Sequence, residues 1–136
     1  MSIPPPRPPL VLVVDDEAPL RRVLDRALTR AGFRVMAVST AEGAYEFLCS
    51  DQADALLLDI HLPTMSGLAL YLAIVHQWPR LQGRVAIMSG DADAEEVSAW
   101  LSRHNCAVLK KPFDLEQVVR WVTRALETRD REAGQA

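Results

Sequence analysis

One stretch of the chain, residues 55–63, constrains the fold most strongly. It reads Ala-Leu-Leu-Leu-Asp-Ile-His-Leu-Pro, so four apolar residues lead directly into Asp59, and Pro63 follows four positions later. A continuous apolar run that ends at a breaker is typical of a strand buried on both faces of a parallel sheet. Asp59 would then stand at the carboxyl end of that strand, where open α/β sheets bind their ligands. Taken alone, however, Asp59 fits a solvated turn aspartate equally well.

The same kind of apolar run recurs along the chain and alternates with segments of helical periodicity. Strands are predicted at residues 10–14, 33–38, 55–59, 85–88 and 106–109. Helices are predicted to begin at Pro19, at a capping box of Ser39 and Glu42, at Ser66, at a cap formed by Asp93 with Glu96, and at Asp114. Five alternating strands and helices predict an α/β fold, a doubly wound, five-stranded parallel sheet with five helices. In the flavodoxin-like strand order 2-1-3-4-5, which we expect for this sheet, the first and third strands would be neighbours.

The length and composition indicate one domain with two tails. Residues 1–9 contain five prolines and are expected to form a Pro-rich flexible tail. Residues 10–128 are expected to form the domain, and residues 129–136 a polar C-terminal tail. A chain of 136 residues is long enough to bury one core. No internal repeat and no second domain is recognisable.

Charge and cysteine usage narrow the classes of function. The net charge of −3 gives no general reason to expect nucleic acid or an anionic membrane as a partner. The apolar runs are far too short to cross a bilayer, and the N-terminus lacks the apolar region of a signal peptide. Cys49 and Cys106 have no metal-binding or redox spacing, which favours a reducing compartment and a cytoplasmic location.

Polar residues directly follow four of the predicted strands. Asp15 and Asp16 follow the first, Asp59 the third, Ser89 the fourth and Lys111 the fifth. In a parallel sheet these positions share one edge, so three carboxylates would come close together and would require a shared proton or cation. A few hard oxygen ligands suit Mg²⁺, and Asp59 could then attack a phosphoryl group whose charge Mg²⁺ and Lys111 neutralise. Lys111 is one of only two lysines beside thirteen arginines, which hints that an ammonium is required there.

Four motifs carry a resemblance to a known family. They are Val-Val-Asp15-Asp16-Glu17, Leu-Leu-Asp59-Ile-His-Leu-Pro63-x-x-Ser66-Gly67, Met-Ser89-Gly90 and Lys111-Pro112-Phe113. In these motifs, and over about residues 10–128, the chain resembles a response-regulator receiver domain of two-component phosphorelays. The resemblance implies that Asp59 is the phospho-acceptor and that Lys111 is the lysine of the site. It also implies that Asp16, Asp59 and the main-chain carbonyl of His61 bind Mg²⁺ directly, with Asp15 acting through water, and that the Lys111–Pro112 bond is cis.

The chain departs from the family pattern at three positions. Val108 stands where many receivers have an aromatic residue, so the usual inward swing of a ring on activation is not expected here. The switch hydroxyl belongs to Ser89, a smaller alternative to threonine, and Ser66 replaces a more common Asp or Asn. His61 and Asp91, two residues after Asp59 and Ser89, are expected to tune how long the phosphoryl group persists.

The sequence therefore predicts a phosphorylation-activated signalling switch that is not an enzyme beyond its own phosphotransfer and dephosphorylation. The expected phosphodonor is a cognate histidine kinase or phosphotransfer protein. The output would be read by another protein or a second copy of this chain, at a face formed by the residue 93–101 helix, the 106–109 strand and the last helix, with Trp100 and Trp121 as anchors.

Two other interpretations remain at this point. The starting Met and the two tails favour a stand-alone regulator, and a receiver cut from a larger regulator or hybrid kinase is the alternative. A Mg²⁺-dependent phosphatase with an aspartyl nucleophile is the alternative of another class. That chemistry usually uses a second carboxylate two residues after the nucleophile, where this chain has His61. Nothing in the sequence names the kinase, the target or the signal.

Overall fold

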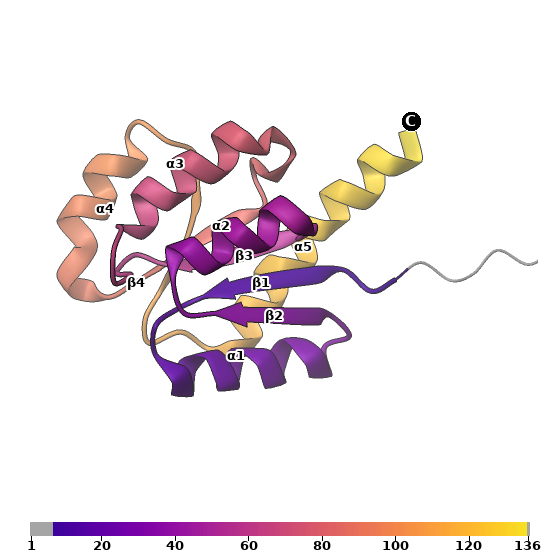
Figure 1. Ribbon diagram of the computed structural model, residues 1–136, viewed down its shortest axis with the longest axis horizontal. Helices are drawn as coiled ribbons and strands as arrows, with labels where there is room; N and C mark the ends of the chain where they lie inside the picture. The colour runs from indigo at the N-terminus through magenta and orange to yellow at the C-terminus, as the bar shows by residue number, and fades with distance from the viewer. Residues whose placement is uncertain (1–6, 136) are drawn as a thin grey trace, which may run out of the picture.

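The computed structural model describes residues 7–135, except for the side chains of Asp91 and residues 128–135 (Figure 1). The strands are β1 (Leu10–Val14), β2 (Arg34–Val38), β3 (Ala55–Asp59), β4 (Val85–Ser89) and β5 (Ala107–Lys110). The helices are α1 (Ala18–Arg30), α2 (Ala41–Ser50), α3 (Gly67–Gln77), α4 (Ala94–Leu101) and α5 (Leu115–Gln135). Two short 3₁₀ turns, η1 (Pro79–Leu81) and η2 (Asp91–Asp93), precede β4 and α4.

The strands form one parallel sheet in the order β2-β1-β3-β4-β5, which confirms the predicted topology. The register pairs Asp59 with Met88 and Ser89 with Lys110, so the ends of β3, β4 and β5 are level with one another. Because the strands all run in the same direction, the residues that follow them meet at a single edge of the sheet.

Each face of the sheet carries its own apolar core. The α2, α3 and α4 helices pack on one face, and α1 and α5 pack on the other, as Figure 1 shows for α1 and α2. Every residue of β1, β3 and β4 is buried, because both faces of these strands are covered. This burial explains why their sequences are apolar runs and not alternating patterns. The β2 strand lies at the edge and alternates between exposed and half-buried residues.

Side-chain caps position several helices. Ser66 accepts a hydrogen bond from the Leu68 amide at 3.1 Å, and Asp114 accepts one from the Glu116 amide at 3.0 Å, as their predicted capping roles require. The capping box predicted for α2 is wrong. The N-cap is Thr40 and not Ser39: Thr40 has an extended backbone conformation, and its hydroxyl accepts from the Gly43 amide at 2.9 Å.

The two ends of the described chain extend the domain differently. The carbonyls of Pro8 and Pro9 accept hydrogen bonds from Arg34 at 2.8 and 2.9 Å, so this part of the predicted tail is attached to β2, while residues 1–6 lie outside the described residues. At the other end α5 continues to Gln135, through residues predicted to form a polar tail. The domain boundary at residue 128 stays a prediction. Among the described residues, no helix is long and apolar enough to cross a membrane.

Candidate functional site

The polar residues predicted to meet at one sheet edge do lie there. Asp15 follows β1 and is fully buried, while Asp59 and Ser89 end β3 and β4 with 4% and 3% of their surface exposed. Lys111 follows β5, and its amide donates to the Ser89 carbonyl at 2.6 Å, which joins the ends of β4 and β5. The Lys111–Pro112 bond is cis, as predicted. Asp16 is exposed at the rim.

The Lys111 ammonium lies between two buried carboxylates. Its Nζ is 3.4 Å from Asp15 Oδ2 and 3.4 Å from Asp59 Oδ1, and Glu17 Oε1 lies further away at 4.0 Å. We call Asp15, Asp59 and Lys111 the lysine pocket. The remaining contacts hold the carboxylates in place: Asp15 Oδ1 accepts from the Glu17 amide at 2.8 Å, and Asp59 Oδ1 accepts from the His61 amide at 3.3 Å.

The electrostatics of the lysine pocket are unfavourable for Asp59. Burial raises the pKa of Asp59, and the neighbouring charge of Asp15 raises it further, against the lowering effect of Lys111. Burial by itself would lower the pKa of Lys111, but the charges of Asp15 and Asp59 outweigh burial and raise it. The ammonium is therefore held firmly in its charged form, while Asp59 keeps its negative charge at a cost in free energy.

The acidic residues at this edge fit a small divalent cation. Carboxylate oxygens of Asp15, Asp16 and Glu17 lie within 4.8 Å of one another, and such hard oxygen donors are those that Mg²⁺ prefers. Glu17 was not among the predicted metal ligands. Asp59 is not part of this close group of carboxylates. It is linked to Asp15 by the Lys111 ammonium, which contacts both carboxylates. The predicted ligand set of Asp16, Asp59 and the His61 carbonyl, with Asp15 acting through water, stays a prediction.

Gly67 supports the end of β3 that carries Asp59. A Cβ atom at Gly67 would lie 2.1 Å from the Asp59 carbonyl oxygen and 2.9 Å from the Ile60 Cα, so the close approach of α3 to this strand requires glycine. The Gly67 amide also donates to the Ile60 carbonyl at 2.7 Å. The sequence marked Gly67 only as part of a motif. Its role in positioning Asp59 became visible with the packing of α3.

A hydrogen-bonded pair of side chains joins the neighbouring loops. His61 Nε2 is 2.6 Å from Asp93 Oδ1, and Asp93 Oδ2 accepts from the Gly90 amide at 3.1 Å. The hydrogen bond from His61 lowers the pKa of Asp93. Asp93 stands at the N-cap position of α4, as predicted, but its side chain makes no cap hydrogen bond, because its carboxylate makes these two contacts instead. Asp91, which was predicted to tune the phosphoryl lifetime together with His61, has no described side chain.

One arginine and one valine lie next to the site. The Arg21 side chain donates to the Asp15 carbonyl at 2.7 Å, a contact that the helical pattern of α1 did not reveal. Val108 is half-buried and borders a hollow of about 490 Å³ beside Ser89, together with residues of α4 that include Val97 and Leu101. The absence of a ring at residue 108 thus leaves space next to the Ser89 end of β4.

Comparisons with known proteins agree with this geometry. The family model for the response regulator receiver domain matches residues 11–123. The DNA-binding transcriptional regulator NtrC of Proteus hauseri is 38% identical over 116 residues, which cover 85% of this chain and 24% of that protein. The chain thus spans about a quarter of the length of such relatives.

Solved structures show the same fold. The receiver domain of NtrX from Brucella abortus is 30% identical with a TM-score of 0.78, and the match covers 87% of this chain and 98% of that domain. The signal receiver domain of an HD domain-containing protein from Pseudomonas fluorescens Pf-5 has a TM-score of 0.84 at 24% identity, covering 99% of this chain and 98% of that one. By its family match and by the relatives that share its sequence, the chain belongs to the response regulator receiver domains, the phosphorylation-controlled switches of two-component systems.

Proposed function

We propose that Asp59 is the residue that receives the phosphoryl group, from a phosphohistidine of a histidine kinase or phosphotransfer protein. The observation that carries this proposal is the position of the Lys111 ammonium, 3.4 Å from the Asp59 carboxylate in a buried pocket at the sheet edge. An acceptor needs a nucleophilic oxygen next to a fixed positive charge, because negative charge gathers on the phosphoryl oxygens during transfer.

The transfer is a simple displacement at phosphorus. An Asp59 carboxylate oxygen forms a bond to phosphorus while the N–P bond of the phosphohistidine breaks. The bonding electrons go to the imidazole nitrogen, which takes up a proton, and Asp59 becomes an acyl phosphate. Hydrolysis reverses the state of the switch, because water attacks phosphorus and releases inorganic phosphate and the Asp59 carboxylate. Lys111 stays charged throughout, since its raised pKa keeps the proton on Nζ.

The proposed cation is Mg²⁺, held by the Asp16 and Asp59 carboxylates and the His61 main-chain carbonyl, with Asp15 acting through water. When bound, it supplies positive charge for the phosphoryl oxygens. The exposed position of Asp16 suits a ligand at the rim, and the fully buried Asp15 suits a residue that orients others.

We further propose that the output surface is formed by α4, β5 and α5, and that a downstream protein or a second copy reads it. Ser89 would hydrogen-bond the new phosphoryl group, and its movement would change the hollow that Val97 and Val108 border. Trp100 and Trp121 are both half-buried, so each leaves part of its ring for a partner. The phosphodonor and the target are thus proposed only as classes of protein, and the cytoplasmic location stays a prediction.

A single experiment tests the acceptor. The chain is incubated with Mg²⁺ and a small-molecule phosphodonor such as acetyl phosphate, and its intact mass is measured. We expect the wild type and the control Asp51→Asn, which changes an exposed aspartate at the end of α2, to gain one phosphoryl group. Asp59→Asn should gain none. Equal phosphorylation of Asp59→Asn would contradict the assignment.

A further inference from the structure

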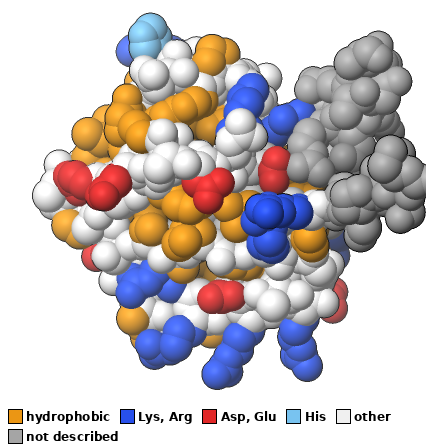
Figure 2. Space-filling view, turned by 45° about the vertical axis from the view of Figure 1, so that its right-hand side comes forward, with side chains coloured by type: hydrophobic (Ala, Val, Ile, Leu, Met, Phe, Trp, Pro, Cys, Tyr) orange, Lys and Arg blue, Asp and Glu red, His pale blue; other side chains and the backbone are white. Residues whose placement is uncertain are grey.

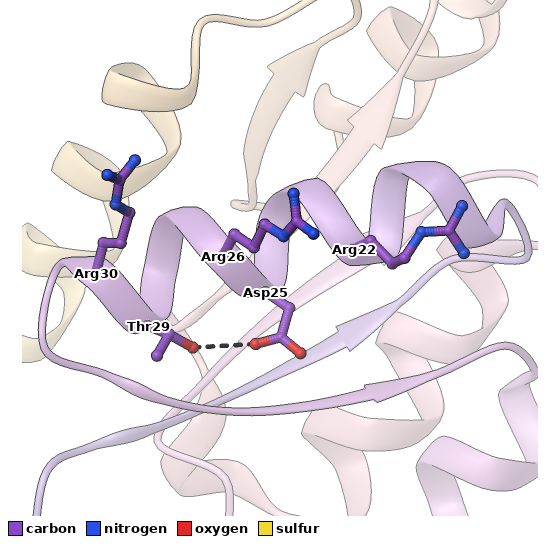
Figure 3. A pocket seen from close by; sticks show the side chains of 5 residues that line it. All are labelled: Arg22, Asp25, Arg26, Thr29 and Arg30. Atoms are coloured by element: carbon purple, nitrogen blue, oxygen red, sulfur yellow. Dashed lines mark hydrogen bonds between the residues drawn. The ribbon is translucent and has the colours of Figure 1, made fainter.

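The outer face of α1 carries a row of three exposed arginines. Arg22, Arg26 and Arg30 follow one another at intervals of four residues and line a shallow exposed pocket (Figure 3). Four residues of α-helix advance by about 6 Å, so the guanidinium groups form a regular ladder. Figure 2 shows basic side chains along the lower border of the molecule, the side on which α1 lies in Figure 1.

The positive charge of this row is not neutralised by other described residues. None of the three arginines makes an ion pair or a side-chain hydrogen bond with them. The nearest acid on the same face, Asp25, accepts a hydrogen bond from Thr29 at 3.0 Å (Figure 3). Like charges four residues apart repel along a helix, so the row lowers the stability of α1 in the isolated chain. A partner with negative charges at the same spacing would relieve that repulsion.

The chain itself offers such a partner surface between α2 and α3. A groove of about 400 Å³ is lined by Ala41, Glu42, Tyr45, Glu46, Met65, Leu70 and Ala73. Its floor is apolar, and it leaves 37% of Tyr45 and 40% of Met65 exposed. Glu42 and Glu46 are four residues apart on α2, so their spacing matches that of the α1 ladder. The Thr64 hydroxyl donates to Glu42 and helps to hold this carboxylate at the groove.

We propose that the arginine row of one copy docks on the groove between α2 and α3 of a second copy, independently of phosphorylation. Arg22 and Arg26 would pair with Glu42 and Glu46 of the second copy. Val23 lies beside the row with 43% of its surface exposed, and it would cover the apolar floor. Matched ladders and apolar residues between them argue for this occupant over a nucleic acid, which the net charge of −3 also disfavours.

The topology decides what such docking builds. The α1 helix packs on one face of the sheet and α2 with α3 on the other, so the two surfaces of one copy point away from each other. They cannot pair within one chain. Because two different surfaces meet, the contact is heterologous, and successive copies add head to tail. The inference is independent of the proposed acceptor, since neither surface includes the lysine pocket.

Sedimentation velocity of the unphosphorylated full chain over a concentration series tests the proposal. At low salt the average sedimentation coefficient should rise with concentration, and at high salt it should return towards that of the monomer, because exposed charges are screened. R22E/R26E and E42R/E46R should each weaken association at least about tenfold, since attraction becomes repulsion. An equimolar mixture of the two variants should assemble again, because each now complements the other. The control R7E/R103E changes two exposed arginines outside both surfaces and outside α4, β5 and α5. It changes the net charge as much as R22E/R26E and should assemble like the wild type.

Each other outcome would overturn the proposal. A wild type that stays monomeric over the series leaves no assembly to explain. Assembly that persists in either charge-reversal variant would place the contact elsewhere, and so would an equal loss of assembly in the R7E/R103E control. If both variants are monomeric and the mixture is too, the two surfaces are not partners. Far-ultraviolet circular dichroism of every variant confirms that the exposed substitutions leave the fold intact.

Discussion

The lysine pocket and the His61–Asp93 pair lie in neighbouring loops, yet they hold charge in opposite ways. In the pocket, Lys111 is 3.4 Å from each of two carboxylates that are almost completely buried, and the pKa of Asp59 is raised. In the pair, one hydrogen bond of 2.6 Å joins an Asp93 of low exposure to a histidine side chain that is 71% exposed, and the pKa of Asp93 is lowered.

The difference lies in whether each buried negative charge is compensated by its neighbours. The His61–Asp93 pair satisfies both partners and connects the β3–α3 and β4–α4 loops. The pocket has one cation for two buried anions, so part of the desolvation of Asp59 is left uncompensated. Groups in this condition are characteristic of sites that gain stability when a ligand or a modification arrives. The following five predictions test this contrast, from the largest expected effect to the smallest.

The largest effect is expected from Gly67→Ala, which disturbs the geometry of the pocket without changing its charges. The new methyl group would meet the Asp59 carbonyl at 2.1 Å, so β3 or α3 must move. We expect a loss of about 3 kcal/mol in the free energy of unfolding, as for overpacking against rigid backbone. Urea denaturation measures it.

The matched control for Gly67→Ala is Gly90→Ala in the adjacent loop. There the nearest atom to a new Cβ is Asp93 Oδ2 at 3.9 Å, an ordinary contact, so little change is expected. Equal effects of the two substitutions would show that the close approach at Gly67 does not position Asp59.

Magnesium should stabilise the lysine pocket, because it compensates the buried negative charge there. At a concentration one hundred times its dissociation constant, a ligand that binds only the folded state adds about 2.7 kcal/mol. We expect a corresponding rise in melting temperature, which Asp16→Ala should abolish and the exposed control Asp51→Ala should retain. An unchanged melting temperature of the wild type at millimolar Mg²⁺ would contradict a cation site here.

Asp59→Asn and Asp93→Asn should change stability in opposite directions in the absence of Mg²⁺. Removing the Asp59 charge relieves repulsion and desolvation, so the free energy of unfolding should rise by about 1 kcal/mol, a typical single-residue effect. Removing the Asp93 charge weakens its bond to His61, so stability should fall. Urea denaturation of both variants at neutral pH measures these changes. If both substitutions changed the free energy of unfolding in the same direction, the contrast between the pocket and the pair would be contradicted.

The pH dependence of Asp59→Asn follows from the same pKa shift. A raised pKa in the folded state means that the folded chain binds the proton more tightly than the unfolded chain. The advantage of Asp59→Asn should therefore be complete above the raised pKa of Asp59. It should shrink as the pH falls through that value, and it should vanish below the ordinary pKa of aspartate. For Asp93 the folded pKa is lowered, so the stability it provides is present above the ordinary pKa and is lost as the pH falls through the lowered one.

The smallest effect is expected from His61→Ala. Its side chain is 71% exposed, and exposed ion pairs contribute at most about 1 kcal/mol. We expect a loss of about 0.5 kcal/mol, and a double-mutant cycle with Asp93→Asn should assign it to the pair. The same two variants should alter the lifetime of the acyl phosphate, measured by loss of the phosphoryl mass, because the pair stands beside the acceptor. Lifetimes within a factor of two of the wild type would limit the pair to a structural role.

The sequence by itself determined the alternation of strands and helices and the polar residues that end the strands. Buried strands such as residues 55–59 must be apolar on both faces, so their sequences are easy to recognise. Because the carboxyl ends of parallel strands share one edge of the sheet, the sequence predicted that Asp15, Asp59, Ser89 and Lys111 lie at the same edge. The sequence also predicted the caps at Ser66 and Asp114, because a cap depends only on hydrogen bonds between residues close together in the chain. The α2 cap was misplaced by one residue, because Ser39 and Thr40 have the same chemistry and only the backbone conformation distinguishes them.

Only the tertiary structure decided which distant groups meet. His61 and Asp93 are 32 residues apart, and no periodicity relates them, because their contact depends on how two loops leave the sheet. The requirement for glycine at residue 67 depends on how closely α3 approaches β3, and the opposite placement of the α1 arginines and the α2–α3 groove depends on which face each helix covers. Sequence patterns record the local environment of each residue, whereas these contacts arise from the paths of the connections between elements.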